Sequence, residues 1–109
     1  MGLEAKEFES VVLICLKVCF MDGVVSESEE EAIFSELSRV YDVSRSEFDG
    51  LVDAFFESEF NLEDLAKNIT KEDLRSLTSR VAKISAESDG LEISESEAWK
   101  KLNTLWEMH

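Results

Sequence analysis

The sequence predicts an all-α protein, folded as a compact single-domain bundle of five to six helices. Three observations carry this prediction. Apolar residues recur at helical spacing along almost the whole chain, and strand-like alternation is almost absent. The 109 residues include no proline and only four glycines, so few positions interrupt a helix. A hydrophobic content of 44%, with seven phenylalanines and two tryptophans, supplies one core and argues against disorder. We therefore expect one domain over residues 1–109.

The first predicted helix, Leu3 to Met21, is apolar on nearly every side. One face carries Phe8, Val11, Val12, Cys15, Val18 and Cys19, and the other carries Leu13, Ile14, Leu16 and Phe20. A helix of this kind is expected in the middle of a bundle. Its apolar run is broken by Lys17 and is too short to span a bilayer, so no membrane insertion is expected.

The second and third predicted helices begin at Ser26 and after Ser44. Each carries apolar residues at intervals of three and four, which predicts one buried face. The side chains expected in the core are Ile33, Phe34, Leu37, Val40 and Tyr41 from the second helix, and Phe48, Leu51, Val52, Phe55 and Phe56 from the third.

Three further helices complete the predicted bundle. A short one spans Asn61 to Ile69, a fifth begins after Thr70 and a sixth begins after Ser94. Their expected core side chains are Leu62, Leu65, Leu74, Leu77, Val81, Ile84, Trp99, Leu102, Leu105 and Trp106. The two tryptophans lie seven residues apart on one face, where they could line a groove, but core packing is the expected role.

Four of these helix starts carry a capping signature, in which a hydroxyl residue is followed three positions later by an acid. The pairs are Ser26 with Glu29, Ser44 with Glu47, Ser94 with Glu97 and, in a weaker form, Thr70 with Asp73. In a capping box the hydroxyl accepts a bond from a free amide of the first turn, and the acid accepts one from the amide of the cap residue. Loss of such a cap costs about 1 kcal/mol.

Two of the capped segments also resemble each other. Residues 22–29 read DGVVSESE, and residues 89–97 read DGLEISESE. Each follows an apolar helix and opens into another helix, so the chain is expected to consist of two helix–acidic loop–helix repeats around the buried first helix. Repeated units of this kind complete each other's core.

The two acidic loops are the predicted functional site. The side chain of an acid in the first turn leans toward the helix N-terminus, and an Asp in the preceding loop approaches the same small volume. Hard divalent cations bind such oxygen ligands, so weak binding of Ca²⁺ or Mg²⁺, not required for folding, is expected. The candidate metal ligands are Asp22, Glu29, Asp89 and Glu97. The second loop has one extra residue, so Glu92 or Glu95 could replace Glu97. In the alternative interpretation the glutamates only cap helices and the aspartates only form turns.

This duplicated pattern resembles the TerB-like (tellurite resistance protein B-like) family. The resemblance runs from Val11-Val12-Leu13 through Asp22-Gly23 to Asp89-Gly90 and Trp99. It implies an all-α domain with internal repeats, whose loop acids cluster and can hold divalent cations. It also implies an association with bacterial tellurite resistance or stress response, and related domains occur in DnaJ-type co-chaperones.

The charge balance limits the partners. Eleven basic and 25 acidic residues give a net charge of −14, which argues against nucleic acid and anionic membranes. A protein partner with a basic surface is favoured instead. The acidic run Glu27, Glu29, Glu30 and Glu31 is expected to be a solvated face, or alternatively a docking surface for that partner. The oligomeric state stays open.

Cysteine usage indicates a reduced, cytoplasmic protein. Cys15 and Cys19 lie one helical turn apart, which is poor geometry for a disulfide. No signal peptide is apparent, because Glu4 and Glu7 stand where a cationic region should be. The thiols could bind a soft metal or handle tellurium chemistry, but packing in the core is the expected role.

Three functions follow as hypotheses. The preferred one is a non-enzymatic TerB-like domain that binds divalent cations weakly and acts in interaction or stress response. The second is an acidic, co-chaperone-type interaction adaptor with no metal role. The third is a Mg²⁺-dependent phosphoester hydrolase. The sequence disfavours this enzyme, because its one histidine is terminal, no phosphate-binding glycine loop is present, and its charge repels phosphates.

Overall fold

Six α-helices make up most of the protein, and the predicted all-α class is confirmed. The computed structural model describes residues 5–20, 25–88 and 93–106, including their side chains except those of residues 5–7 and 93–95. The helices are α1 (Ala5–Cys19), α2 (Glu27–Ser38), α3 (Arg45–Glu57), α4 (Leu62–Lys67), α5 (Glu72–Glu87) and α6 (Ile93–Leu105). No strand occurs in the described parts of the chain.

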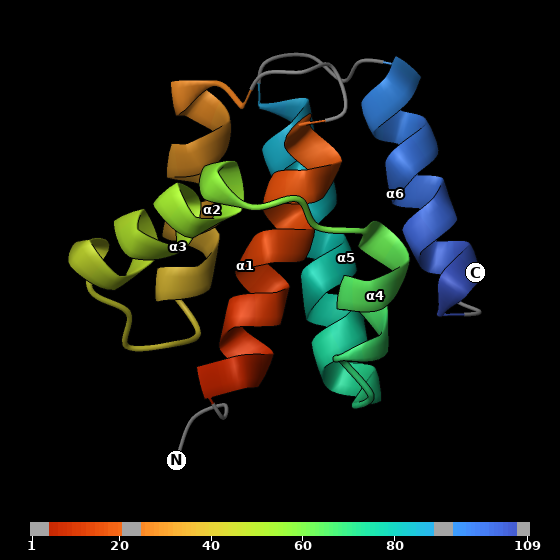
Figure 1. The fold of residues 1–109 in the computed structure, drawn as a ribbon, viewed down its shortest axis with the longest axis horizontal. Helices are drawn as coiled ribbons and strands as arrows, with labels where there is room; N and C mark the ends of the chain where they lie inside the picture. The colour runs from red at the N-terminus through yellow and green to blue at the C-terminus, as the bar shows by residue number, and fades with distance from the viewer. Residues whose placement is uncertain (1–4, 21–24, 89–92, 107–109) are drawn as a thin grey trace.

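The first helix passes through the middle of the bundle, as its apolar circumference predicts (Figure 1). Helix α1 contacts each of the five other helices. Its side chains from residue 10 to residue 19 are all buried except Lys17, which is half-buried. The sequence expectation of a central helix is therefore confirmed, and Lys17 is the exception that needs an explanation.

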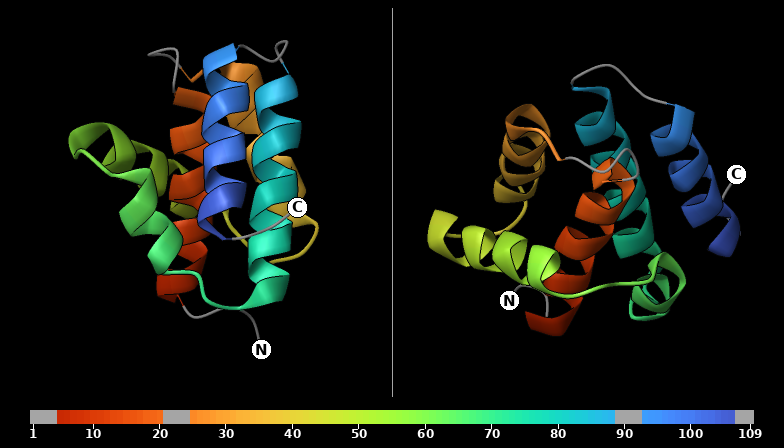
Figure 2. Two further views of the ribbon diagram at one scale, coloured as in Figure 1. Left: turned by 90° about the vertical axis from the view of Figure 1, so that its right-hand side faces the viewer. Right: turned by 45° about the horizontal axis from the view of Figure 1, so that its top comes forward.

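The other helices surround α1 unequally. Helix α5 packs against α1, α2 and α6, whereas α3 packs mainly against α1. Figures 1 and 2 show α1, α2, α5 and α6 running roughly along one direction, with α3 lying across them. Among the helices of the structure, none is long and apolar enough for a bilayer crossing.

An arginine joins the crossing helix α3 to α2. The Nη1 atom of Arg45 lies 2.6 Å from Oε1 of Glu31, and its Nε donates to Asp49 at 3.2 Å. The same guanidinium lies over the rings of Phe34 and Phe48, 5.0 Å and 5.7 Å from their centroids. Because these ion pairs are solvent-exposed, we expect each to add only about 0–1 kcal/mol.

Two indole N–H groups attach α6 to its neighbours. Trp106 Nε1 donates to the carbonyl of Ala66 in α4 at 3.0 Å, and Trp99 Nε1 donates to the carbonyl of Ser79 in α5 at 2.8 Å. The hydroxyl of Ser79 also donates to Oδ1 of Asn103 at 2.7 Å. Trp106 is buried and Trp99 packs half-buried against the core, so the predicted core role of both tryptophans is confirmed.

Two of the predicted caps lie where the sequence places them. Ser26 and Ser44 are N-caps, and each hydroxyl accepts a 3.1 Å bond from the amide three residues later, Glu29 or Glu47. The full reciprocal box forms at Ser26. At Ser44 the hydroxyl instead donates to the Glu47 carboxylate at 3.0 Å.

The other two helix starts differ from the prediction. The N-cap of α5 is Lys71 and not Thr70, because the Lys71 carbonyl accepts the first helical bond, from the Arg75 amide at 3.0 Å. No side chain accepts a capping hydrogen bond at this N-terminus of α5. Helix α6 begins at Ile93, so Ser94 lies inside the helix instead of before it.

Four of the predicted core side chains are exposed instead. They are Val40 (51%), Phe56 (51%), Ile84 (38%) and Leu105 (40%). Val40 lies beyond the end of α2, where helical periodicity no longer applies. Phe56 follows Phe55 directly, and neighbouring residues of a helix point about 100° apart, so only one of the two faces the core. The side chain that packs in the core is Phe55, which is 5% exposed.

Candidate functional site

The helix ends that flank both Asp-Gly loops lie at one end of the bundle. Figures 1 and 2 show the C-terminal ends of α1 and α5 and the N-terminal ends of α2 and α6 gathered there. Asp22, Asp89 and Glu92 themselves lie outside the described residues, as does the side chain of Glu95. The helix ends before and after each of the two predicted acidic loops therefore lie at the same end of the bundle.

Glu29 is the predicted ligand for which the structure gives a full environment. Its Oε1 accepts a 2.9 Å bond from the Ser26 amide, while its own amide donates to the Ser26 hydroxyl at 3.1 Å. The residue is only 3% exposed, although it was expected on a solvated face. Its carboxylate therefore serves the helix cap, and a cation would have to share it through the second oxygen.

Glu97, the fourth predicted ligand, lies in the second turn of α6 and is solvent-exposed. Among the side chains that the structure describes (residues 8–20, 25–88 and 96–106), no three of His, Cys, Asp or Glu are grouped to hold a metal ion. That statement does not cover Asp22 or Asp89, so the predicted cation site stays a prediction.

The acidic run at the start of α2 divides among different environments. Glu27 is exposed, whereas Glu31 pairs with Arg45 of α3. Burial raises the pKa of the Glu30 carboxyl, an effect that the neighbouring positive charge of Arg45 partly offsets. The run is thus only in part the solvated face that its composition predicts.

Both cysteines belong to the core, as predicted. Cys15 and Cys19 are fully buried thiols. The Cys15 thiol donates to the carbonyl of Thr78 in α5, with an Sγ to O distance of 3.9 Å. Burial raises the pKa of the Cys15 thiol far above its ordinary value, because the thiolate would lose its hydration. A thiol held protonated in this way is inert as a nucleophile.

An aromatic surface that the sequence did not indicate lies at the end of α3. We call Phe20, Phe55, Phe56 and Phe60 the phenylalanine patch. Edge-to-face contacts join Phe20 to Phe55 and Phe56, with centroid distances of 5.5 Å and 5.6 Å. Phe60 stacks on Phe55 at 6.2 Å. Phe55 is buried, Phe20 and Phe60 are half-buried, and Phe56 is half exposed. The patch is therefore a rigid aromatic surface with one ring open to solvent.

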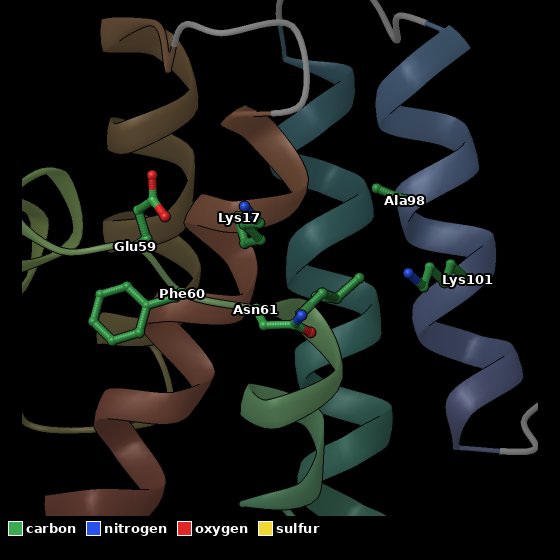
Figure 3. Close-up of a pocket in the computed structure, with 7 residues that line it drawn as sticks. Lys17, Glu59, Phe60, Asn61, Ala98 and Lys101 are labelled. Carbon is green, nitrogen blue, oxygen red and sulfur yellow. The ribbon is translucent and has the colours of Figure 1, made fainter.

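A pocket of about 400 Å³ adjoins the phenylalanine patch, between α1, α4 and α6. Figure 3 shows side chains of these helices, and of the segment before α4, around it. Its lining consists of Lys17, Glu59, Phe60, Asn61, Leu62, Ala98 and Lys101. Phe60 belongs to both features. The one sequence signal for this pocket is Lys17, the lysine that interrupts the apolar run of the first helix.

No family model, curated protein or solved structure matches this chain. The functional argument therefore depends on the residues and their geometry.

Proposed function

We propose that this chain is a non-enzymatic protein-binding module, and that a basic amphipathic helical segment of its partner docks on the phenylalanine patch. The observation that carries the proposal is the 51% exposure of Phe56, whose ring is in edge-to-face contact with the buried ring of Phe55. A large aromatic side chain that is held rigidly at the surface loses little entropy on binding. Aromatic residues, phenylalanine included, are enriched at protein interfaces, where they bury a large apolar area.

The charge around the patch supports a basic partner. Asp53, Glu57 and Glu59 are exposed on and just after α3. None of the three forms an ion pair with another described residue. Asp53 lies three positions before Phe56 and thus shares its side of the helix. With a net charge of −14, the chain attracts cationic segments over long range as well.

The test uses a synthetic amphipathic peptide with leucines along one face and lysines along the other. Titrated into the ¹⁵N-labelled protein, it should shift amide resonances of Phe20, Phe56 and Phe60 saturably. Phe56→Ser should weaken binding about tenfold or more, because interface aromatics of this kind contribute about 2 kcal/mol.

Matched controls separate docking from unspecific attraction. Val40 is also 51% exposed, but it follows α2 and is not part of the phenylalanine patch. Val40→Ser should therefore leave the affinity for the peptide unchanged. Glu57→Gln should reduce the affinity more than Glu87→Gln, which removes the same charge at the exposed end of α5. The proposal is wrong if a scrambled peptide of equal composition binds as well, or if the shifts avoid the patch.

We propose divalent-cation binding at the two Asp-Gly loops as a second function, in keeping with the resemblance to the TerB-like family. It is supported by the common end of the bundle at which the flanking helices of both loops meet (Figure 2). A cytoplasmic location and a role in tellurite or stress response belong to the same proposal. The two buried thiols, Cys15 and Cys19, are in keeping with a reducing compartment.

A further inference from the structure

We propose that the pocket between α1, α4 and α6 binds a small organic anion that carries one carboxylate on an apolar body, with Lys17 as its anchor. This inference does not depend on the docking of a protein partner on the phenylalanine patch. It rests on the position of one lysine, on the composition of the pocket walls and on the balance of charge among the lining residues.

Lys17 lies in an unfavourable place for a charge that has no partner. Every other residue from 10 to 19 in α1 is buried, at 9% exposure or less. Lys17 is half-buried and forms no ion pair with another described residue. Its position in the last turn of α1 offers the modest attraction of the helix C-terminus. A partly desolvated ammonium group gains much more from an anion placed beside it.

The walls of the pocket fit an apolar body. Phe60, Leu62 and Ala98 line it, and Leu62 and Ala98 are themselves almost fully buried. Its volume of about 400 Å³ is within the range of pockets that hold small molecules. An eight-carbon chain therefore has room alongside these side chains while its charged end lies at Lys17.

The lining of the pocket is less acidic than the rest of the chain. Two of its lining residues, Lys17 and Lys101, are basic and only Glu59 is acidic, although acidic residues outnumber basic ones by 25 to 11 in the chain. Lys101 extends from α6 toward the pocket in Figure 3. It is already paired with Glu63 of α4 at 3.1 Å, and both side chains are more than half exposed. Lys17 is thus the main cation, which favours a ligand with a single negative charge over a polyphosphate.

The test uses octanoate as the probe, with octanol and octylammonium as head-group controls. Octanoate should shift the amide resonances of Lys17, Phe60, Leu62 and Ala98 saturably in the ¹⁵N-labelled protein. Octanol should bind at least about tenfold more weakly, because it lacks the charge-assisted bond. Octylammonium should not bind at this pocket.

Variants then assign the anchor. Lys17→Met keeps the apolar stem and should weaken octanoate binding about tenfold. Lys101→Met should weaken it about two- to threefold, since that ammonium is shared with Glu63. Lys100→Met removes the same charge from a neighbouring exposed site of α6 outside the pocket, and it should have no effect. Phe56→Ser, which disrupts the patch, should also leave octanoate binding intact.

Three results would overturn the proposal. They are the absence of saturable shifts below the critical micelle concentration of octanoate, equal affinity for octanol, and unchanged affinity in Lys17→Met. If Lys17→Met does not fold, the comparison of octanoate with octanol on the unmodified protein still decides the question. Loss of octanoate binding in Phe56→Ser would place the ligand on the patch and would also contradict the assignment.

Discussion

Removing the Glu29 carboxylate should destabilise the protein even when no metal is present. Glu29→Ala deletes the 2.9 Å bond from the Ser26 amide to a carboxylate that is only 3% exposed. It leaves that amide without a partner in a partly buried position. A charge-assisted bond of this kind contributes about 1.5–3 kcal/mol, so we expect a loss of about 2 kcal/mol in the free energy of unfolding.

The conservative variant Glu29→Gln separates the cap from a metal ligand. The amide oxygen of glutamine can accept the same bond, and glutamine serves in capping boxes. We therefore expect Glu29→Gln to cost about 0.5–1 kcal/mol. A divalent cation, in contrast, loses a charged ligand as fully in Glu29→Gln as in Glu29→Ala.

The measurement is urea and thermal unfolding followed by far-UV circular dichroism, with EDTA and with millimolar Ca²⁺. In EDTA, a loss of about 2 kcal/mol lowers the melting temperature of a chain of this length by about 9 °C. Ser26→Ala should lower it by about 4 °C, as expected for the loss of one cap of about 1 kcal/mol. Ser44→Ala, at the exposed cap of α3, is the matched control and should cost less than Ser26→Ala.

The reasoning is refuted if Glu29→Ala matches the unmodified protein in EDTA and is less stable only with Ca²⁺. Glu29 would then act as a cation ligand, and the cap would contribute nothing measurable. Stabilisation by Ca²⁺ that is present in the unmodified protein and absent from Glu29→Gln would support the loop cation site. Asp22→Asn should then act only through the metal.

Two further predictions test the core. Iodoacetamide at pH 8 should leave Cys15 and Cys19 unmodified in the folded protein and should label both in urea, as measured by intact mass. The reason is that both thiols are fully buried and that burial raises the pKa of Cys15. Labelling of the folded protein at the rate of an accessible thiol would contradict this packing. Trp106→Phe should cost about 1–3 kcal/mol in urea unfolding, since it shortens a buried side chain and removes the indole bond to the carbonyl of Ala66, which then accepts only from backbone amides such as that of Ile69. Trp99→Phe should cost less because Trp99 is half-buried, and the reverse order would contradict these contacts.

The sequence by itself determined the helices, because their signals are local. The apolar circumference of α1 predicts its central position, and the spacing of Ser26 and Glu29 predicts a capping box that the structure contains. Backbone periodicity and first-turn hydrogen bonds depend on residues three or four positions apart, which the chain displays directly. Of the predicted cation site, the sequence likewise supplied the loop positions, but Asp22 and Asp89 lie outside the described residues.

Tertiary packing decided what local patterns leave open. Only packing chose Phe55 for the core and left Phe56 at the surface, since both belong to the same apolar run. Packing also buried Glu29, which the acidic run suggested would be solvated. The pocket beside Lys17 combines residues from α1, from α4 and the segment before it, and from α6. No spacing along the chain encodes that meeting, because it depends on how three helices pack against one another.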